Sequence, residues 1–258
     1  MSDSGKYSAV KVTQVWRWTD HLFSFRTERP DWFRFQAGQF ARLGLAEADD
    51  APPSVWRAYS IVSGPYDDFL EYYSIVVPGG AFTSRLKDLQ PGGTLFMERQ
   101  NHGFLTLERF ALQGDLFLLA SGTGLAPYLS ILADPLTWDS FDRIVLVHSV
   151  RLQNELAYRE HIESLAENEL FKDNAYKLIY LPTVTREPSS YLNARIPQLI
   201  QTGALEQKSN TPLSKERSKF MLCGNPEMVQ ETRIALKEKG FVSARSSRPG
   251  EIATENYW

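Results

Sequence analysis

The spacing of apolar residues changes partway along this chain, and that change constrains the fold more than any other feature. From Tyr7 to about Leu107, apolar and β-branched residues form short, partly alternating runs separated by turn residues. Such runs at nearly regular spacing indicate an antiparallel β-barrel. The expected strands are Ser8–Val12, Leu22–Phe25, Phe40–Leu43, Trp56–Val62, Glu71–Val77 and Thr94–Met97, with one helix at Ser84–Leu89.

After a short segment from Glu108 to Gly114, apolar runs alternate instead with amphipathic segments of helical length. This alternation predicts an α/β fold built on a parallel sheet. We expect strands at Leu116–Ala120, Arg143–His148, Lys177–Pro182 and Phe220–Cys223, and helices at Pro127–Ala133, Tyr158–Glu167 and Glu227–Lys239. Gly240 is expected to end the last helix in a left-handed conformation. The sequence therefore predicts two domains, 1–108 and 109–258.

Composition excludes several classes of protein. Cys223 is the single cysteine, so an internal disulfide, a four-cysteine iron–sulfur cluster and a thiolate zinc site are all excluded. The four histidines, His21, His102, His148 and His161, are scattered and form no catalytic or metal-binding motif, so we expect no metal.

Charge and hydropathy bear on partners and location. The net charge of −3 provides no overall field for nucleic acid, which we do not expect as a partner. Apolar runs are far shorter than the roughly 20 residues of a membrane-spanning helix, and the start carries no cationic, apolar leader. We therefore expect a cytoplasmic protein without a membrane contact.

Two motifs in the first half could bind a phosphate-bearing cofactor. Arg57-Ala58-Tyr59-Ser60 lies on an expected strand, where alternation places Arg57 and Tyr59 on one face and Ala58 and Ser60 on the other. Pro78–Leu86 combines glycines with Thr83 and Ser84 at a helix start, where backbone N–H groups and hydroxyls can hold a phosphate. The alternatives are an ordinary barrel strand with an exposed arginine and an ordinary Ser/Thr-capped helix.

In the second half, Gly122-Thr123-Gly124 follows a strand and precedes a helix with Pro127 in its first turn. This arrangement predicts a pyrophosphate-binding junction, although Pro127 stands where a classical dinucleotide fingerprint has its third glycine. The next two strand ends carry Arg151 and Arg186, and Arg195 follows. Basic groups there suit a 2′-phosphate, the alternative being surface ion pairs, with Glu155 and Glu187 as candidate partners.

A second glycine turn, Cys223-Gly224-Asn225-Pro226, follows the last expected strand. A lone cysteine is more often a core residue than a functional one, so its position at a strand end carries the interpretation. The chain closes with Tyr257-Trp258. Two aromatic rings at a terminus could cover the flat ring of a cofactor.

The four motifs together, Arg-x-Tyr-Ser, Gly-x-x-Thr-Ser-x-Leu, Gly-Thr-Gly-x-x-Pro and Cys-Gly-Asn-Pro, resemble those of the plant-type ferredoxin-NADP reductase family. Within it, the chain is similar to the bacterial flavodoxin/ferredoxin-NADP reductases that end in Tyr-Trp. The resemblance covers nearly the whole chain. It implies an N-terminal FAD-binding barrel (1–108), a C-terminal NADP-binding domain (109–258) and a C-terminal tail that returns to the flavin.

The resemblance also implies roles for individual residues. Arg57 would bind the FAD pyrophosphate, Tyr59 would pack on one flavin face and Tyr257 on the other, and Trp258 would stack on the adenine. The implied FAD residues are Arg57, Ala58, Tyr59, Ser60, Tyr73, Ser74, Ile75, Ala81, Phe82, Thr83, Ser84, Thr123, Tyr257 and Trp258. The implied NADP(H) residues are Val150, Arg151, Thr185, Arg186, Asn193, Arg195, Cys223, Gly224 and Asn225. Four residues are expected to act at the reacting rings: Ser60, Cys223 and Glu255 would help to set geometry and charge, and Tyr257 would move aside for the nicotinamide.

We therefore expect a monomeric FAD enzyme that transfers hydride between NADPH and FAD and exchanges single electrons with ferredoxin or flavodoxin. Two alternatives stay open from the sequence. One is an NAD(P)H-flavin reductase with another acceptor, and the other is a flavin-binding regulatory module without turnover. The arginines and the terminal aromatic residues disfavour the second alternative, because a sensor without turnover has no need of a 2′-phosphate site.

Overall fold

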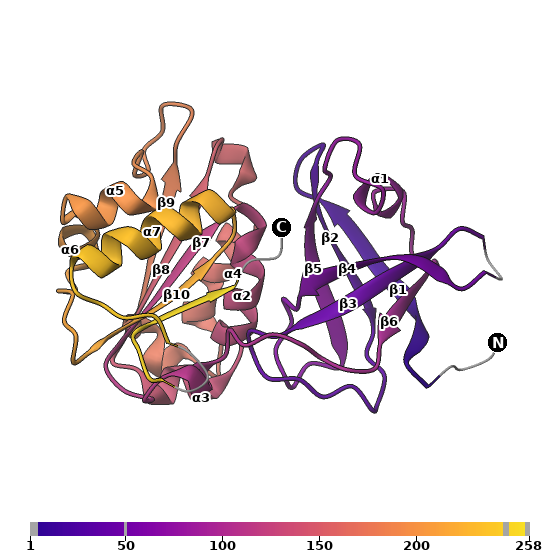
Figure 1. The fold of residues 1–258 in the computed structure, drawn as a ribbon, viewed down its shortest axis with the longest axis horizontal. Coiled ribbons are helices and arrows are strands. Elements are labelled where there is room, and N and C mark those ends of the chain that lie inside the picture. Colours follow the sequence, from indigo (N-terminus) through magenta and orange to yellow (C-terminus); the bar gives the residue numbers. More distant parts are fainter. Residues whose placement is uncertain (1–4, 49–50, 245–247, 256–258) are drawn as a thin grey trace. The chain divides into compact units, whose positions relative to one another are not determined.

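A computed structural model describes residues 5–48, 51–244 and 248–255 of the chain. Two compact units make up the fold (Figure 1). The first comprises Met1–Thr106 and Ala126–Ala133, and the second Leu107–Leu125 and Asp134–Trp258. The change in apolar spacing along the sequence thus corresponds to a change from one unit to the other.

The first unit is an antiparallel sheet in the order β4-β3-β6-β1-β2-β5, which closes on itself. A bridge between Ile61 and Tyr72 joins the two outer strands, and the Val62 amide donates to the Glu71 carbonyl at 2.8 Å. The elements are β1 (Tyr7–Arg17), β2 (Leu22–Glu28), β3 (Phe40–Ala46), β4 (Pro53–Ser60), β5 (Phe69–Ile75), α1 (Thr83–Leu86) and β6 (Thr94–Glu98). The expected barrel is confirmed.

The alternation of buried and exposed residues along the strands gives the sheet one apolar face, around which the barrel closes. On β1, Val10 and Val12 are buried while Ala9, Lys11 and Thr13 are exposed, so one face of the strand joins the core. Inside the barrel these valines join an aromatic-rich cluster that includes Phe23, Phe25 and Tyr72.

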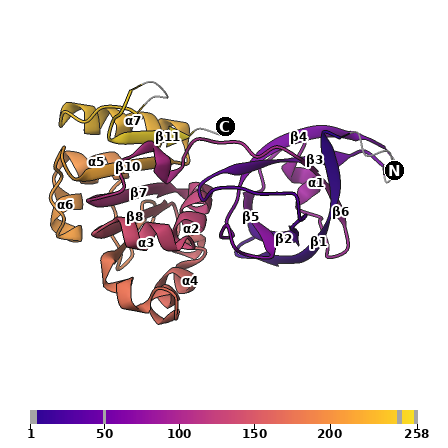
Figure 2. The same cartoon turned by 90° about the horizontal axis from the view of Figure 1, so that it is seen from below.

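The second unit is a five-stranded parallel sheet in the order β11-β10-β7-β8-β9. Helices α5 and α7 cover one face, and α3 and α4 lie on the other (Figure 2). Its strands are β7 (Asp115–Ser121), β8 (Arg143–Val150), β9 (Leu178–Val184), β10 (Ser218–Cys223) and β11 (Ile252–Glu255). Its helices are η1 (Leu107–Arg109), η2 (Gly122–Leu125), α3 (Pro135–Ser140), η3 (Gln153–Glu155), α4 (Arg159–Ser164), η4 (Leu165–Glu167), η5 (Lys172–Lys177), α5 (Ile196–Gln201), α6 (Ala204–Ser209) and α7 (Pro226–Glu238).

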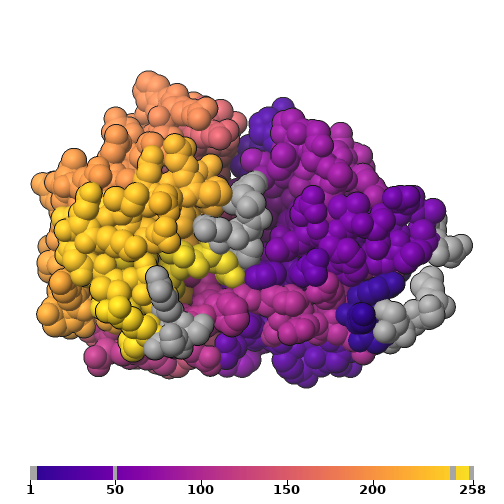
Figure 3. All heavy atoms as spheres, viewed as in Figure 1, coloured from indigo at the N-terminus to yellow at the C-terminus, as the bar shows by residue number. Residues whose placement is uncertain are grey.

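The central strands explain why this half of the sequence shows continuous apolar runs. Every residue of β10 is buried, as is every residue of β7 except Ser121, because helices cover both faces of a parallel sheet. Asn225 caps α7, and Gly240 follows that helix at φ +90°, as expected. Helix α7 and the segments after it occupy much of the surface of this unit on the face that Figure 3 presents.

Helix α2 (Ala126–Leu132) follows the glycine turn of β7 but belongs to the first unit. All seven of its residues are buried, and the Ser130 hydroxyl donates to the carbonyl of Ser63 at 2.7 Å. Two other helices differ from expectation. Helix α1 is a single turn, and the expected Tyr158–Glu167 helix divides into α4 and the 3₁₀ turn η4.

Candidate functional site

Tyr59 brings together the three cofactor-binding segments expected in the first unit. Its hydroxyl lies 3.0 Å from Ser74 Oγ on β5, and its ring centroid lies 5.7 Å from that of Phe82, which precedes α1. Burial raises the pKa of Tyr59 to about 12, so the phenol stays protonated at physiological pH. Closure of the barrel between β4 and β5 therefore assembles this site from segments distant in the sequence.

Polar groups suited to an anionic cofactor lie on the segments that Tyr59 brings together. Arg57 is exposed, its guanidinium donates to the carbonyl of Trp56 at 2.7 Å, and it forms no salt bridge within the described ranges. The hydroxyls of Ser60 and Ser84 are partly exposed and make no hydrogen bond to the described residues. The other expected residues here are buried (Tyr73, Ser74, Phe82), half-buried (Ala58, Ile75, Thr83) or exposed (Ala81).

Thr83 closes the turn before α1. Its Oγ1 accepts from the Val77 amide at 3.0 Å, and Gly79 in this turn has φ +71°. A Cβ at Gly80 would lie 3.1 Å from the Val77 carbonyl oxygen, so the turn is tightly folded. The alternative of an ordinary Ser/Thr-capped helix is wrong, because Phe82 occupies the N-cap without a side-chain hydrogen bond.

In the second unit, the parallel register aligns the carboxyl ends of the strands. Ser121 pairs with Ser149, Val150 with Val184, and Cys223 with Ala120. The residues expected to bind the dinucleotide follow these strand ends. The register therefore brings Thr123, Arg151, Thr185 and Gly224 to one edge of the sheet, the usual location of ligand sites in open parallel sheets.

Two glycines allow the turns after β7 and β10 to pack backbone against backbone. A Cβ on Gly124 would lie 2.4 Å from the Cys223 carbonyl oxygen, and one on Gly224 would lie 2.4 Å from Ser121 Oγ. Ser121 Oγ also accepts from the Asn225 amide at 2.9 Å. Ser121 could not be identified from the sequence, because its partner Asn225 lies 104 residues away in the chain.

The arginines at this edge differ in their partners. Arg151 and Arg186 are exposed and form no salt bridge in the described part of the chain, whereas Arg195 Nη2 lies 2.9 Å from Glu231 Oε2 on α7. The suggested acidic partners are occupied elsewhere, because Glu155 accepts from the Arg151 amide and Glu187 from the Gln153 amide. The ion-pair alternative therefore holds for Arg195 alone. Thr185 donates its hydroxyl to the Val150 carbonyl, and Asn193 is exposed.

One row of side chains crosses the whole sheet just below this edge. The register joins Glu255, Cys223, Ala120, His148 and Pro182, in that order, on five adjacent strands. Cys223 is buried, and burial together with the Glu255 carboxylate raises the pKa of its thiol, which therefore stays protonated. His148 could not be singled out from the sequence, because none of the four histidines lies in a motif.

His148 makes the stability of the fold depend on pH. Burial lowers its pKa from 6.5 to about 4, so between these values the unfolded chain binds more protons and stability falls as pH falls. We expect His148→Met to remove about 3 kcal/mol of this loss between pH 6.5 and pH 4. Urea titrations of both proteins across that window measure it, and parallel pH curves would contradict the prediction.

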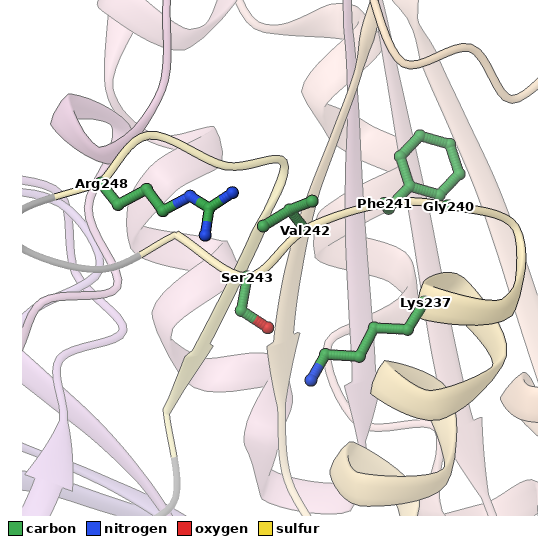
Figure 4. Close-up of a pocket in the computed structure, with 6 residues that line it drawn as sticks. All are labelled: Lys237, Gly240, Phe241, Val242, Ser243 and Arg248. Carbon is green, nitrogen blue, oxygen red and sulfur yellow. The ribbon is translucent and has the colours of Figure 1, made fainter.

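One cavity in the described part of the chain does not coincide with the expected site residues. This cavity of about 390 Å³ is lined by Lys237, Gly240, Phe241, Val242, Ser243 and Arg248, none of them an expected site residue (Figure 4). Among the described residues, no cluster of three potential metal ligands occurs, and no helix is long and apolar enough to cross a membrane. Tyr257 and Trp258 lie outside the described residues.

A closed antiparallel barrel followed by a parallel sheet, with glycine turns and exposed arginines at its carboxyl edge, defines the class of two-domain nucleotide-dependent oxidoreductases. Residues 118–233 match the family model of the oxidoreductase NAD-binding domain.

Known relatives extend this match to the whole chain. The ferredoxin–NADP reductase of Pseudomonas aeruginosa is 41% identical over 249 residues, which is 95% of each chain. The flavodoxin/ferredoxin–NADP reductase of Escherichia coli is 40% identical over 96% of this chain and 97% of its own. A crystal structure of a ferredoxin NADP⁺ reductase from Neisseria gonorrhoeae with bound FAD and NADP has a TM-score of 0.90 at 36% identity, covering 98% of this chain and 99% of its own. The chain belongs to the ferredoxin/flavodoxin–NADP reductase family.

Proposed function

We propose that this protein transfers hydride between NADPH and FAD and exchanges single electrons with ferredoxin or flavodoxin. The names of its relatives and the geometry of both units support this function. When bound, FAD supplies a ring that takes up two electrons as a hydride and releases them singly. In this proposal, residues 1–108 form the FAD domain, and residues 109–258 form the NADP domain and the tail.

The chain's own residues position FAD. Arg57 binds the pyrophosphate, for which its exposed guanidinium, free of salt bridges to the described residues, is suited. Tyr59, held by its contacts with Ser74 and Phe82, would pack on one face of the flavin, and Ser60 would lie beside the flavin N5. The remaining FAD contacts come from Ala58, Tyr73, Ile75, Ala81, Thr83, Ser84 and Thr123.

The NADPH assignment rests on Arg151 and Arg186, two exposed arginines beside the strand ends that form no salt bridge with the residues the structure describes. They hold the 2′-phosphate together with Thr185 and Arg195, while Val150 and Asn193 complete the adenosine site. Cys223, Gly224 and Asn225 lie at the nicotinamide end. There the Cys223 thiol, kept protonated by burial, and the neighbouring Glu255 set the geometry and charge at the reacting atoms.

We also propose a monomer that works in the cytoplasm and binds no nucleic acid. The net charge of −3 disfavours nucleic acid, and the buried free thiol of Cys223 suits a reducing compartment. The alternative with a different electron acceptor predicts the same flavin reduction by NADPH. An assay of cytochrome c reduction with and without added ferredoxin or flavodoxin separates it, because it predicts no stimulation by either protein.

The experiment that tests the function is an anaerobic absorbance titration of the purified FAD-loaded protein with NADPH and then with NADH. We expect the flavin absorbance to bleach at far lower concentrations of NADPH than of NADH. A yellow protein inert to both nucleotides would support the non-catalytic flavin module instead. A protein that stays colourless after FAD is added would overturn the roles of Arg57 and Thr83.

Glu231 competes with the 2′-phosphate for Arg195 in this proposal, because the two side chains form a 2.9 Å ion pair. Both are partly exposed, and such pairs are worth up to about 1 kcal/mol, so Glu231→Gln should tighten binding of adenosine 2′,5′-bisphosphate about two- to fivefold. Calorimetry measures this, with Glu238→Gln on the same helix as the control. Equal affinity in Glu231→Gln and wild type would contradict the competition.

The sequence also predicts a role for the last two residues. Deletion of Tyr257 and Trp258 should loosen FAD and ease access of nicotinamide to the ring face that Tyr257 covers. Fluorescence of FAD released on dilution and the KM ratio of NADPH to NADH measure these effects. Unchanged FAD retention and coenzyme preference would refute the stacking roles.

A further inference from the structure

His148 is a wholly buried histidine at the carboxyl end of β8. Its Nε2 lies 3.2 Å from the carbonyl oxygen of Gly122, and its exposed fraction is 0%. A carbonyl oxygen only accepts, so Nε2 carries the ring hydrogen and Nδ1 is a bare acceptor. Nδ1 is buried and has no hydrogen-bond partner among the residues that the structure describes.

This arrangement is costly for the fold. Leaving a buried acceptor unsatisfied costs about 1–3 kcal/mol, which an apolar side chain of similar size would avoid. The neighbours of His148 in its row, Ala120 and Pro182, have no polar side-chain group that could compensate. What the ring does supply is the hydrogen bond to Gly122.

Gly122 begins the turn that connects β7 to α2 and has φ +54°. The turn is held from the β10 side, because the Asn225 amide donates to Ser121 and Gly124 packs against the Cys223 backbone. His148 holds it from the β8 side. Thr123, partly exposed, lies between these two anchors.

We propose that His148 is a positioning residue for hydride transfer, acting through its hydrogen bond to Gly122 to hold the turn that presents Thr123. The inference rests on the proposed function, in which Thr123 is one of the FAD contacts. His148 itself touches neither. It orients a segment of backbone, and small displacements of positioning groups can slow a reaction strongly.

Two substitutions of similar length test the hydrogen bond. His148→Gln keeps an N–H donor near the Nε2 position, whereas His148→Met fills the space without one. We expect His148→Met to unfold at an equal or higher urea concentration at pH 7, yet to reduce flavin about tenfold more slowly at saturating NADPH, with NADPH affinity within about twofold. His148→Gln should restore the rate to within about twofold of wild type.

Hydrogen exchange without nucleotide gives a second readout. Amides of residues 122–125 should exchange faster in His148→Met than in wild type or His148→Gln. A wild-type rate in His148→Met, or equal slowing in both variants, would overturn the proposal. If His148→Met does not fold, the ¹⁵N shifts of the wild-type imidazole decide, the Nε2–H tautomer supporting the proposal and the Nδ1–H tautomer overturning it.

Failure of the proposed function can be told apart from failure of the inference about His148. A wild-type protein whose flavin NADPH does not reduce would refute hydride transfer. The exchange and tautomer measurements would still decide whether His148 holds the Gly122 turn.

Discussion

Replacing Arg151 and Arg186 together by alanine should raise the KM for NADPH about a hundredfold or more and change the KM for NADH by less than about threefold. Each guanidinium is exposed and free of salt bridges within the described part of the chain, so neither loses a protein partner on binding nucleotide. Charge-assisted hydrogen bonds to a phosphate are worth roughly 1.5–3 kcal/mol each. NADH lacks the 2′-phosphate and therefore does not use them.

Steady-state kinetics with both coenzymes measures this split. Arg233→Ala is the matched control. Arg233 lies on α7 and not at the strand ends that carry Arg151 and Arg186, and it donates to Gln230 on its own helix. It should leave both KM values unchanged. Equal increases for NADPH and NADH in the double variant would show that these arginines support the fold or bind the shared diphosphate, and would remove the 2′-phosphate assignment.

Gly124→Ala should destabilise the protein by about 3 kcal/mol and abolish tight NADPH binding. The added Cβ would lie 2.4 Å from the Cys223 carbonyl oxygen and 2.6 Å from Gly224 Cα. Both contacts are with backbone atoms, so no side chain can rotate away. Relief requires the turns after β7 and β10 to separate, which displaces the residues proposed to lie at the nicotinamide end.

Gly122→Ala in the same turn provides a graded comparison. Gly122 has φ +54°, and a Cβ added there would meet no atom within 4 Å, so its substitution costs only about 1 kcal/mol of backbone strain. Urea denaturation of both variants gives the two values. If Gly124→Ala costs no more than Gly122→Ala, the two glycine turns do not pack backbone to backbone.

Much of the fold was predictable because apolar spacing records which faces of an element are buried. Val10 and Val12 alternate with exposed residues on β1, and β7 is buried on both faces, so both patterns were legible without coordinates. β11 was not predicted, since four residues near a chain end show no period and termini usually fray. Only pairing with the buried strand β10 makes Ile252–Glu255 a strand.

Some features of the candidate site could likewise be predicted from the sequence, and others could not. The glycine turns after β7 and β10 were found from sequence, because tight backbone approach demands glycine. The short length of α1 was not, since after Leu86 the Asp88 and Leu89 amides bond three residues back, to Arg85 and Leu86, and no local pattern marks that change. The pairing of Arg195 with Glu231 was also missed, because it joins the start of α5 to α7, two elements well separated in the chain.

The sequence by itself determined the barrel, the parallel sheet and the motifs that identify the family, since these depend on local spacing and on residue types with special backbone freedom. The tertiary structure decided that Arg195 pairs with Glu231 and placed His148 in one row with Cys223 and Glu255. The physical reason is register. Which side chains meet across a sheet depends on the pairing of strands far apart in the chain, and no local pattern encodes that pairing.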